Sequence, residues 1–366
     1  MPASLEFEDV FQWGVIDWHF RIQRPQHIAR GLARRGHRTF YFSSDFIDSP
    51  EPGYRIETLS DDGRLNVVYL HVAGSPSIYP SAATKTTEKA LRASLAVFIA
   101  DAEPRAILSI VQHPFWAPFA DIVPNRRLIY DMMDHHAGFG DGAADILELE
   151  QWLLRESDQV IVTSDFLADV ARAENGAVAI VRNAAEYKHF APRPERVFTD
   201  PKGRRVIGYY GAIAHWFDVD LIKRVAERFP EALILLVGAD SVGVRAQLKA
   251  FPNVMFTGEV KYTDLPYYLY GFDVCLLPFK IIPLTQATNP VKIYEYLSAG
   301  KPVVSVDVPE IAQFGSLVAV GGSHDAFLDH IHDALSCPAD AAAIAARRSF
   351  AARNTWDVRA SELAEA

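Results

Sequence analysis

Short apolar runs alternate with amphipathic segments along nearly the whole chain. In the first half the apolar runs predict strands near Gly14–Asp17, Arg38–Phe42, Asn66–Leu70, Ala106–Ile110, Leu128–Asp131, Gln159–Val162 and Val178–Val181. Helical periodicity predicts helices between them, near Pro25–Arg35, Ala82–Ala100, Ala143–Glu156 and Asp165–Ala173. This alternation is typical of α/β proteins with parallel sheets.

The segment Ala184–Arg205 interrupts the pattern, because it is polar, contains prolines and has little periodicity. We interpret it as an interdomain linker. The alternation then resumes with strands at Val206–Tyr210, Ala232–Val237, Val254–Thr257, Val274–Leu277 and Val303–Val306, and with helices at Asp218–Arg228, at Leu265–Tyr270 and from Pro290. A last helical segment covers Ala339–Ala366. Two successive doubly wound domains are therefore expected, with ligands at the carboxyl ends of their strands.

Composition narrows the class of protein. The chain has 366 residues, of which 49% are hydrophobic and 22% charged, which indicates two globular domains of ordinary size. Cys275 and Cys337 form neither a disulfide framework nor a metal-binding spacing, which favours a reducing compartment. The acidic start and the lack of a long apolar run predict no signal peptide and no membrane span, hence a cytoplasmic protein. A net charge of −10 argues against a nucleic-acid partner.

One stretch departs from this acidic balance. Arg21–Arg38 contains no acid and carries Arg24, Arg30, Arg34 and Arg35. We expect it either to contact an anionic membrane peripherally, at the inner face, or to attract a phosphate-bearing substrate. The alternative is an ordinary solvated helix face.

The segment Asn289–Ser305, NPVKIYEYLSAGKPVVS, is the most informative part of the chain. It predicts a helix capped by Asn289, with Pro290 in the first helical position, followed by a buried strand. A helix N-terminus attracts phosphate, and Lys292 adds a full charge there. Glu295 lies three residues further on, where its carboxylate can accept hydrogen bonds from a ribose diol. The alternative is that Lys292 and Glu295 form an exposed surface pair.

Several segments, in the same order, resemble GT-B glycosyltransferases, most closely glycosyltransferase family 4 and related transferases of bacterial polysaccharide biosynthesis. The resembling segments are Arg24–Arg38, Val160–Val170, Val181–Pro192, Pro252–Phe279 and Asn289–Ser305. The resemblance implies an α/β GT-B architecture of two Rossmann-like domains facing a cleft. Residues 1–190 would form the acceptor domain, completed by a C-terminal helix at about 350–366. Residues 200–345 would bind the nucleotide sugar.

The resemblance also implies an activity. The expected reaction transfers a sugar from a nucleoside-diphosphate sugar, such as a UDP-sugar, to a glycan, lipid-linked or small-molecule acceptor, with retention of configuration. Glu295 would hold the ribose, and Asn289, Pro290, Val291 and Thr288 would line the donor site. No cofactor and no metal are expected besides the donor co-substrate. The oligomeric state is not predicted.

Two departures from the family pattern matter for the donor. The family usually has a second glutamate eight residues before the ribose-binding one, where this chain has Ala287. The family also presents an arginine and a lysine after the first strand of the second domain, where this chain reads YYGAIAHWFD around Gly211. Gly211 keeps the tight turn, but the positive charges of the family's arginine and lysine are missing. Lys292 would then neutralise the diphosphate, with Lys280 and His215 as further candidates; the alternatives are a solvated loop lysine and a structural histidine.

The first domain supplies the candidates for chemistry. Asp131, Asp134, His135 and His136 follow a buried strand, where a carboxylate can act as a base or a histidine can orient the donor sugar. One acid could instead cap the next turn, and a metal site of Asp131, His135 and His136 fits no common zinc pattern. His113 also follows a strand, with Phe115 and Trp116 either stacking on a sugar or packing in the core. Acceptor-binding candidates lie in the first loop: Asp17, His19, Arg21 and Arg24. Arg24 could instead pair with an acid at the start of its helix.

Other functions stay open at this point. An inverting transferase would use Asp131 or Asp134 as its base. A nucleotide-sugar epimerase, a two-lobed binding protein and a noncatalytic GT-B scaffold are further alternatives.

Overall fold

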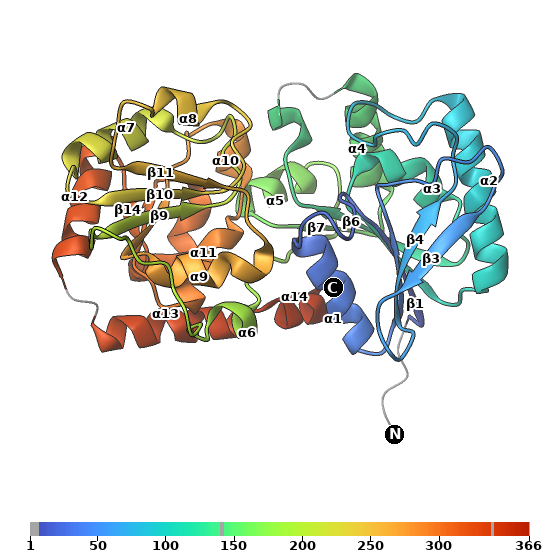
Figure 1. The fold of residues 1–366 in the computed structure, drawn as a ribbon. Helices are drawn as coiled ribbons and strands as arrows, with labels where there is room; N and C mark the ends of the chain where they lie inside the picture. Colours follow the sequence, from blue (N-terminus) through green and yellow to red (C-terminus); the bar gives the residue numbers. More distant parts are fainter. Residues whose placement is uncertain (1–6, 140–142, 338–339, 366) are drawn as a thin grey trace. The chain divides into compact units, whose positions relative to one another are not determined.

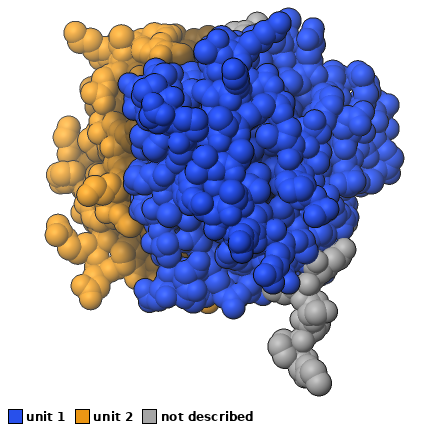
Figure 2. Space-filling model, turned by 90° about the vertical axis from the view of Figure 1, so that its right-hand side faces the viewer, with its two compact units in different colours: residues 1–182, 356–366 blue, residues 183–355 orange. Residues whose placement is uncertain are grey.

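The computed structural model describes residues 7–139, 143–337 and 340–365. Residues 1–6, 140–142, 338–339 and 366 lie outside the described part, including the ends of the predicted first domain and last helix. The chain divides into two compact units, coloured separately in Figure 2: residues 1–182 with 356–366, and residues 183–355. The predicted domains had placed the division between 190 and 200.

The first unit is built on an eight-stranded sheet. Its spatial order is β3-β4-β2-β1-β5-β6-β7-β8, and all neighbours are parallel except the antiparallel pair β3 and β4. The strands are β1 Asp9–Trp13, β2 Arg38–Phe42, β3 Tyr54–Thr58, β4 Leu65–Leu70, β5 Ile107–Val111, β6 Arg126–Met132, β7 Gln159–Val162 and β8 Val178–Ile180. The strand order changes direction at β1 and β5.

Helices cover both faces of this sheet, with α1 and α14 side by side on one of them (Figure 1). The helices are α1 Arg24–Arg34, α2 Lys85–Ala102, η1 Pro114–Trp116, α3 Ala117–Asp121, η2 His136–Phe139, α4 Ala144–Glu156, α5 Asp165–Arg172 and α14 Trp356–Glu365. The ring of Trp356 stacks on His27 at 5.0 Å. Gly31 lets α14 approach closely, since a Cβ there would meet the Cβ of Ala360 at 2.3 Å. The C-terminal helix thus belongs to the first unit.

The second unit is a six-stranded parallel sheet in the order β11-β10-β9-β12-β13-β14. Its strands are β9 Val206–Tyr210, β10 Leu233–Val237, β11 Val254–Gly258, β12 Val274–Leu277, β13 Val303–Val306 and β14 Ala319–Gly321. In chain order this is 3-2-1-4-5-6, the doubly wound Rossmann topology, which binds ligands where the order reverses, here at β9 and β12. The predicted fold class is confirmed.

In Figure 1, α7 and α8 lie on one face of the second sheet, and α9, α11 and α13 lie on the other. The helices of this unit are α6 Tyr187–Phe190, α7 Val219–Arg228, α8 Val244–Gln247, η3 Tyr262–Asp264, α9 Leu265–Gly271, α10 Pro283–Ala287, α11 Val291–Ser298, η4 Pro309–Leu317, α12 His324–Ser336 and α13 Ala341–Arg353. The apolar strands and these helices bury one continuous core.

Two sequence predictions about segments were wrong. The first strand is Asp9–Trp13, and the predicted Gly14–Asp17 is the loop that follows it. The segment 184–205 is not a free linker, because Phe190 is fully buried in the core of the second unit. The amide of Phe198 also donates to the carbonyl of Tyr267 at 2.9 Å. The segment is therefore the first packed part of the second unit.

The basic helix α1 makes contacts within its own unit. Arg34 forms an ion pair with Asp357 on α14, and Arg35 donates to Ser361 and, at 3.4 Å, to Glu365. The guanidinium of Arg30 lies 5.2 Å from the ring centre of Trp18. Arg34 and Arg35 therefore contact α14, whereas Arg30 lies against Trp18. Among the described residues, no helix is both long and apolar enough to span a bilayer.

Candidate active site

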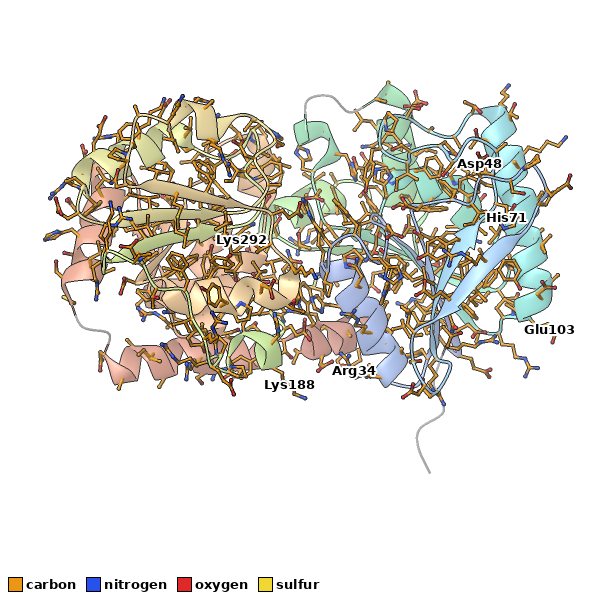
Figure 3. All side chains as sticks on the ribbon, in the orientation of Figure 1. Arg34, Asp48, His71, Glu103, Lys188 and Lys292 are labelled. Carbon is orange, nitrogen blue, oxygen red and sulfur yellow. The ribbon has the colours of Figure 1, made fainter. Side chains whose placement is uncertain are left out.

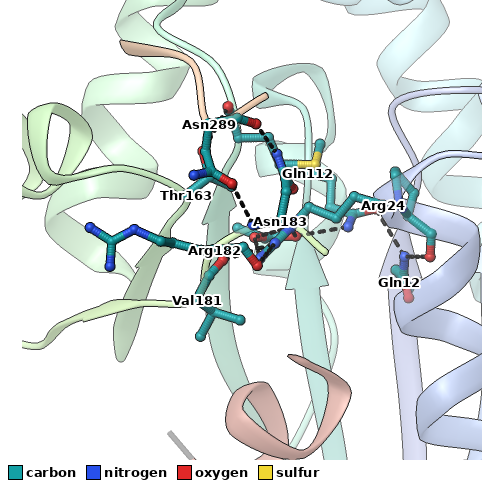
Figure 4. Close-up of polar contacts among 11 residues, drawn as sticks. Gln12, Arg24, Gln112, Thr163, Val181, Arg182, Asn183 and Asn289 are labelled. Atoms are coloured by element: carbon teal, nitrogen blue, oxygen red, sulfur yellow. Dashed lines mark hydrogen bonds and ion pairs between the residues drawn. The ribbon is translucent and has the colours of Figure 1, made fainter. Parts of the chain in front are cut away.

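The helix α11 begins one residue later than the sequence predicts. Pro290 is the N-cap, with an extended backbone, and Val291 is the first helical residue. The predicted cap, Asn289, is used elsewhere: its Oδ1 accepts from the amide of Asn183 at 2.9 Å, and its Nδ2 donates to Glu310 at 2.8 Å. The side chain of Asn183 also donates to the carbonyl of Asn289 at 2.7 Å (Figure 4). Asn289 thus holds the start of α11 in place and does not cap it.

Lys292 lies in the first turn of α11 and reaches the glycine turn after β9 (labelled in Figure 3). Gly211 has a φ of +129°, and a Cβ at this position would meet Cε of Lys292 at 2.0 Å. Glycine is therefore required both for the backbone and for the path of the lysine. The Nζ of Lys292 lies 5.8 Å from the ring centres of both Tyr209 and Phe279. Gly211 and Lys292 are both predicted donor-site residues, and the structure places them side by side.

Glu295 is buried, with 7% of its surface exposed, so the alternative of an exposed surface pair is wrong. The hydroxyl of Tyr210 donates to its Oε2 at 2.8 Å. Burial raises the pKa of Glu295 to about 7, while the Tyr210 hydrogen bond and the charge of Lys292 act to lower it. A carboxylate whose pKa lies so close to neutrality, beside a lysine in the first turn of a helix, is typical of a functional position.

The remaining donor-side candidates lie on loops at the same edge of the sheet. His215 is exposed, with its ring edge against Trp216, and Lys280 is exposed as well. Their two loops are joined, because the amide of Lys280 donates to the carbonyl of Trp216 at 2.7 Å. The hydroxyl of Thr288 donates to the carbonyl of Leu284 at 2.7 Å, at the end of α10. His215 and Lys280 thus lie on adjoining loops, whereas Thr288 stabilises a helix end.

Sequence reasoning missed the tyrosines that support this site. Tyr210 at the end of β9 and Tyr296 on α11 are buried, and the Tyr296 hydroxyl accepts from the amide of Tyr210 at 3.2 Å. An aromatic residue in an apolar strand gives no sign in the sequence that its hydroxyl meets a carboxylate. The buried Glu310 was missed because its partner Asn289 lies 21 residues away in the sequence.

In the first unit, Arg24 and Asp131 form a buried ion pair. Arg24 donates to both carboxylate oxygens, with its shortest contact at 2.8 Å, and also to the carbonyl of Val181 at 2.9 Å (Figure 4). Gln112 donates to Asp131 at 2.9 Å, and Asp131 is 0% exposed. The structure therefore argues against both predicted roles, acceptor binding for Arg24 and catalysis for Asp131. The acid that pairs with Arg24 lies at the end of β6 and not at the start of its own helix.

The other predicted catalytic residues gather at the ends of β5 and β6. The rings of His113 and His136 meet edge to face at 5.3 Å, and the ring of Tyr79 lies 5.8 Å from that of His113. Burial lowers the pKa of His113 to about 3 and that of His136 to about 4, so both imidazoles are neutral at pH 7. Burial and the nearby Asp131 raise the pKa of Asp134 to about 6. Burial also lowers the pKa of His135.

His113 has a structural contact as well, since its Nδ1 accepts from the amide of Phe115 at 3.2 Å. Phe115 and Trp116 are buried in the core, which decides between the two alternatives for them. Among the described residues, no group of histidine, cysteine, aspartate and glutamate is arranged to hold a metal ion, and the Asp131, His135 and His136 set is not assembled.

The loop after β1 holds the remaining acceptor candidates. Asp17 accepts from the amide of His19 at 2.8 Å and from the hydroxyl of Ser43 at 2.9 Å. The imidazole of His19 contacts the carboxylate of Glu57 at 3.1 Å. The guanidinium of Arg21 lies 4.7 Å from the ring centre of Phe20. Asp17 thus lies beside Ser43, which directly follows β2, whereas His19 reaches Glu57 on the edge strand β3.

Solved structures share this fold along almost the whole chain. The sucrose-phosphate synthase of Thermosynechococcus elongatus matches with a TM-score of 0.73 and 14% identity over 98% of both chains. An E. coli structure, trehalose-6-phosphate bound with UDP-2-fluoro glucose, matches with a TM-score of 0.73 and 10% identity over 98% of both chains. Anabaena Alr3699/HepE in complex with UDP and glucose gives 0.70 and 15% over 98% of both. At these identities the likeness shows the fold, which is GT-B.

Two matches in sequence relate the chain to glycosyltransferases in particular. Residues 204–337, in the second unit, match the family described as glycosyl transferases group 1. A candidate teichuronic acid biosynthesis glycosyltransferase of Bacillus subtilis (strain 168), TuaH, is 29% identical over 206 residues. That match spans 51% of this chain and 52% of the relative, about half the length of each. The resemblance to GT-B glycosyltransferases that the sequence predicted is confirmed.

Proposed function

We propose that this protein is a glycosyltransferase that moves a sugar from a nucleoside-diphosphate sugar to a hydroxyl-bearing acceptor. The observation that carries the proposal is the group formed by Gly211, Lys292 and Glu295 at the strand-order reversal of the second unit. A glycine turn, a cation on the first turn of a helix and a buried carboxylate suit a diphosphate and a ribose diol. The match of residues 204–337 to glycosyl transferases group 1 supports the same function.

The second unit would supply the electrostatics of the reaction. When the glycosyl bond breaks, negative charge grows on the leaving diphosphate, and Lys292 and the first amides of α11 would stabilise it. Glu295 would accept hydrogen bonds from the ribose hydroxyls, with Tyr210 fixing the orientation of its carboxylate. HepE, a neighbour of the same fold, was solved with UDP-glucose. We therefore propose a UDP-sugar as the first donor to test.

The first unit would bind the acceptor, a glycan, a lipid-linked sugar or a small molecule. Retention of configuration follows from the family resemblance. For inversion, Asp134 would be the base, because Asp131 is held by Arg24 and Gln112. The anomeric configuration of the product, read by NMR on a single turnover, decides between the two courses.

The test of the proposed function compares donor binding with turnover. Calorimetry with UDP, ADP and GDP and with their glucose conjugates identifies the base, and release of the free nucleoside diphosphate in the presence of sugar acceptors reports transfer. We expect Glu295→Ala to weaken nucleotide binding roughly tenfold to a hundredfold, because it removes charged hydrogen bonds. The matched control is Glu227→Ala, an exposed glutamate on α7.

Two outcomes would count against the proposal. Nucleotide affinity that Glu295→Ala leaves unchanged would show that α11 is not the donor site. Tight binding without any transfer, across a broad panel of acceptors, would favour the noncatalytic GT-B scaffold.

A further inference from the structure

A cavity of about 240 Å³ lies at the carboxyl end of the second sheet, on the side of β12, β13 and β14. Its walls are Asp218, Phe279, Ile281, Val306 and the turn 321–324 between β14 and α12. All of these residues belong to the second unit. The residues assigned so far to the nucleotide, Gly211, Lys292 and Glu295, do not line it.

The cavity adjoins the place proposed for the diphosphate. The loop after β9 runs antiparallel to the loop after β12: the amide of Asp218 donates to the carbonyl of Pro278 at 2.9 Å, and Phe217 bridges to Phe279. Phe279 is a wall of the cavity, and its ring centre lies 5.8 Å from the Nζ of Lys292. A group attached to a diphosphate held by Lys292 is therefore within reach of the cavity.

The walls combine hydroxyl-binding groups with apolar surface. Oδ1 of Asp218 caps α7 by accepting from the amide of Leu221 at 2.9 Å, and Oδ2 contacts the imidazole of His324 at 3.2 Å. A carboxylate has about four acceptor positions, so it can take hydroxyl donors in addition to these two. Phe279 and Val306 offer apolar surface to the C–H face of a sugar ring.

Size and charge restrict what the cavity can hold. Pockets for drug-sized ligands measure about 300–1,000 Å³, so this smaller cavity suits one monosaccharide ring. The Asp218 carboxylate disfavours a second carboxylate, and therefore a uronic acid, inside the same walls. A neutral hexose fits both conditions.

We propose that this cavity holds the sugar of the nucleotide-sugar donor, and that Asp218 and His324 read its hydroxyl groups. The inference rests on the proposed function and deepens it, because it assigns the sugar subsite and its selectivity for neutral hexoses. It also accounts for Ala287, since hydroxyl recognition would come from the loops after β9 and β14 and not from the end of α10, where Ala287 lies.

The test separates the sugar from the nucleotide. Calorimetry measures the affinity of each variant for a nucleoside diphosphate and for its glucose and glucuronate conjugates. His324→Ala removes one of the two side chains proposed to bind the sugar hydroxyls. Asp218→Asn removes the negative charge of the other while keeping a good N-cap for α7. Gly322→Leu narrows the cavity, and a Cβ at Gly322 meets nothing within 4 Å, so the backbone tolerates it. His332→Ala, an exposed histidine on α12 outside the cavity, is the matched control.

We expect the three cavity variants to bind the free nucleoside diphosphate as the wild type does and to bind its glucose conjugate about fivefold to thirtyfold more weakly. We also expect the wild type to prefer the glucose conjugate to the glucuronate. Unchanged binding of the glucose conjugate in all three variants, or an equal loss of affinity for the free nucleoside diphosphate, overturns the inference while the proposed function stands. A wild type that binds none of the nucleotides overturns both.

Discussion

Each unit buries one glutamate against the hydroxyl of a strand tyrosine, and the two pairs have almost the same geometry. In the first unit Tyr130 on β6 donates to Glu150 on α4 at 2.9 Å. In the second unit Tyr210 on β9 donates to Glu295 on α11 at 2.8 Å. Both glutamates are buried, and burial raises the pKa of each to about 7.

The surroundings of the two glutamates differ in charge. Asp134 acts to raise the pKa of Glu150, whereas Lys292 acts to lower that of Glu295. The charges beside the two carboxyls thus act in opposite directions on the two pKa values, although burial raises both of them to about 7. The same local motif therefore serves the packing of an acidic region in one unit and suits the binding of hydroxyl groups in the other.

The largest expected effect comes from Arg24, which forms a buried ion pair with Asp131 in the first unit. Arg24→Ala leaves the buried Asp131 carboxylate without its ion pair, so we expect a loss of about 3–5 kcal/mol in the unfolding free energy of the first unit. Urea unfolding followed by tryptophan fluorescence measures this, because five of the six tryptophans lie in that unit.

The control for this prediction is Arg35→Ala, whose ion-pair partner on α14, Glu365, is exposed, with an expected loss of about 0–1 kcal/mol. An equally small loss for Arg24→Ala would mean that the buried pair contributes little, and that Arg24 is available for another role.

The next largest effect is expected on nucleotide affinity, from the loss of Lys292, the cation beside Glu295. Lys292→Met removes the charge proposed to face the diphosphate and keeps the length of the side chain. We expect nucleotide affinity, measured by calorimetry at pH 8, to fall roughly tenfold to a hundredfold. Lys223→Met, on α7 and paired with Asp220, is a matched control and should change the affinity little. An unaltered affinity in the Lys292 variant would assign the phosphate site elsewhere.

The third prediction is the pH dependence of donor binding. If the ribose binds the ionised form of Glu295, whose pKa is about 7, affinity rises with pH up to that value and levels off above it. The expected rise is at most about tenfold per pH unit. A nucleotide sugar is the probe, because its doubly esterified diphosphate does not titrate between pH 6 and 8. Glu295→Gln should give a flat profile, and a flat profile in the wild type would contradict the role of the ionised carboxylate.

The smallest expected effect is the pH dependence that Glu150 gives to the stability of the first unit. The pKa of Glu150 is raised above its usual value of 4.5 to about 7, so between these values the folded state holds a proton that the unfolded state releases. Stability of the first unit should therefore fall as pH rises through this window, by at most about 1.4 kcal/mol per pH unit from this group. Glu150→Gln should flatten the slope measured by urea unfolding from pH 5 to 7. Equal slopes in the variant and the wild type would show that Glu150 is ionised in both states.

Most of the strand pattern could be predicted from the sequence because buried parallel strands are continuous apolar runs. Val206–Tyr210, Val274–Leu277 and Val303–Val306 have the predicted bounds. The first strand was placed wrongly because Asp9 and Gln12 break its apolar pattern. Asp9 is buried by its pair with Arg38, and Gln12 by its hydrogen bonds to Pro25 and Gln112, and such distant partners leave no local signal.

The candidate site was predictable where one local segment carries it. The spacing of Lys292 and Glu295 on one helix made the donor prediction, whereas the sequence could not show that Asp131 would meet Arg24, 107 residues away. Asp131 lies in a dense polar cluster of the sequence, yet its carboxylate oxygens already accept hydrogen bonds from Arg24 and Gln112. The cavity beside Asp218 joins four separate loops, so no single motif could reveal it.

The return of α14 to the first unit has a consequence for the order of synthesis. Domains usually fold as they leave the ribosome, the N-terminal one first. Here Trp356, which stacks on His27, is made only after residues 183–355, the entire second unit, have been translated. The surface of α1 that α14 covers in the finished protein therefore stays exposed while the second unit is being made. An arrest of translation before residue 356 would release a chain whose inserted unit is complete but whose enclosing unit is not.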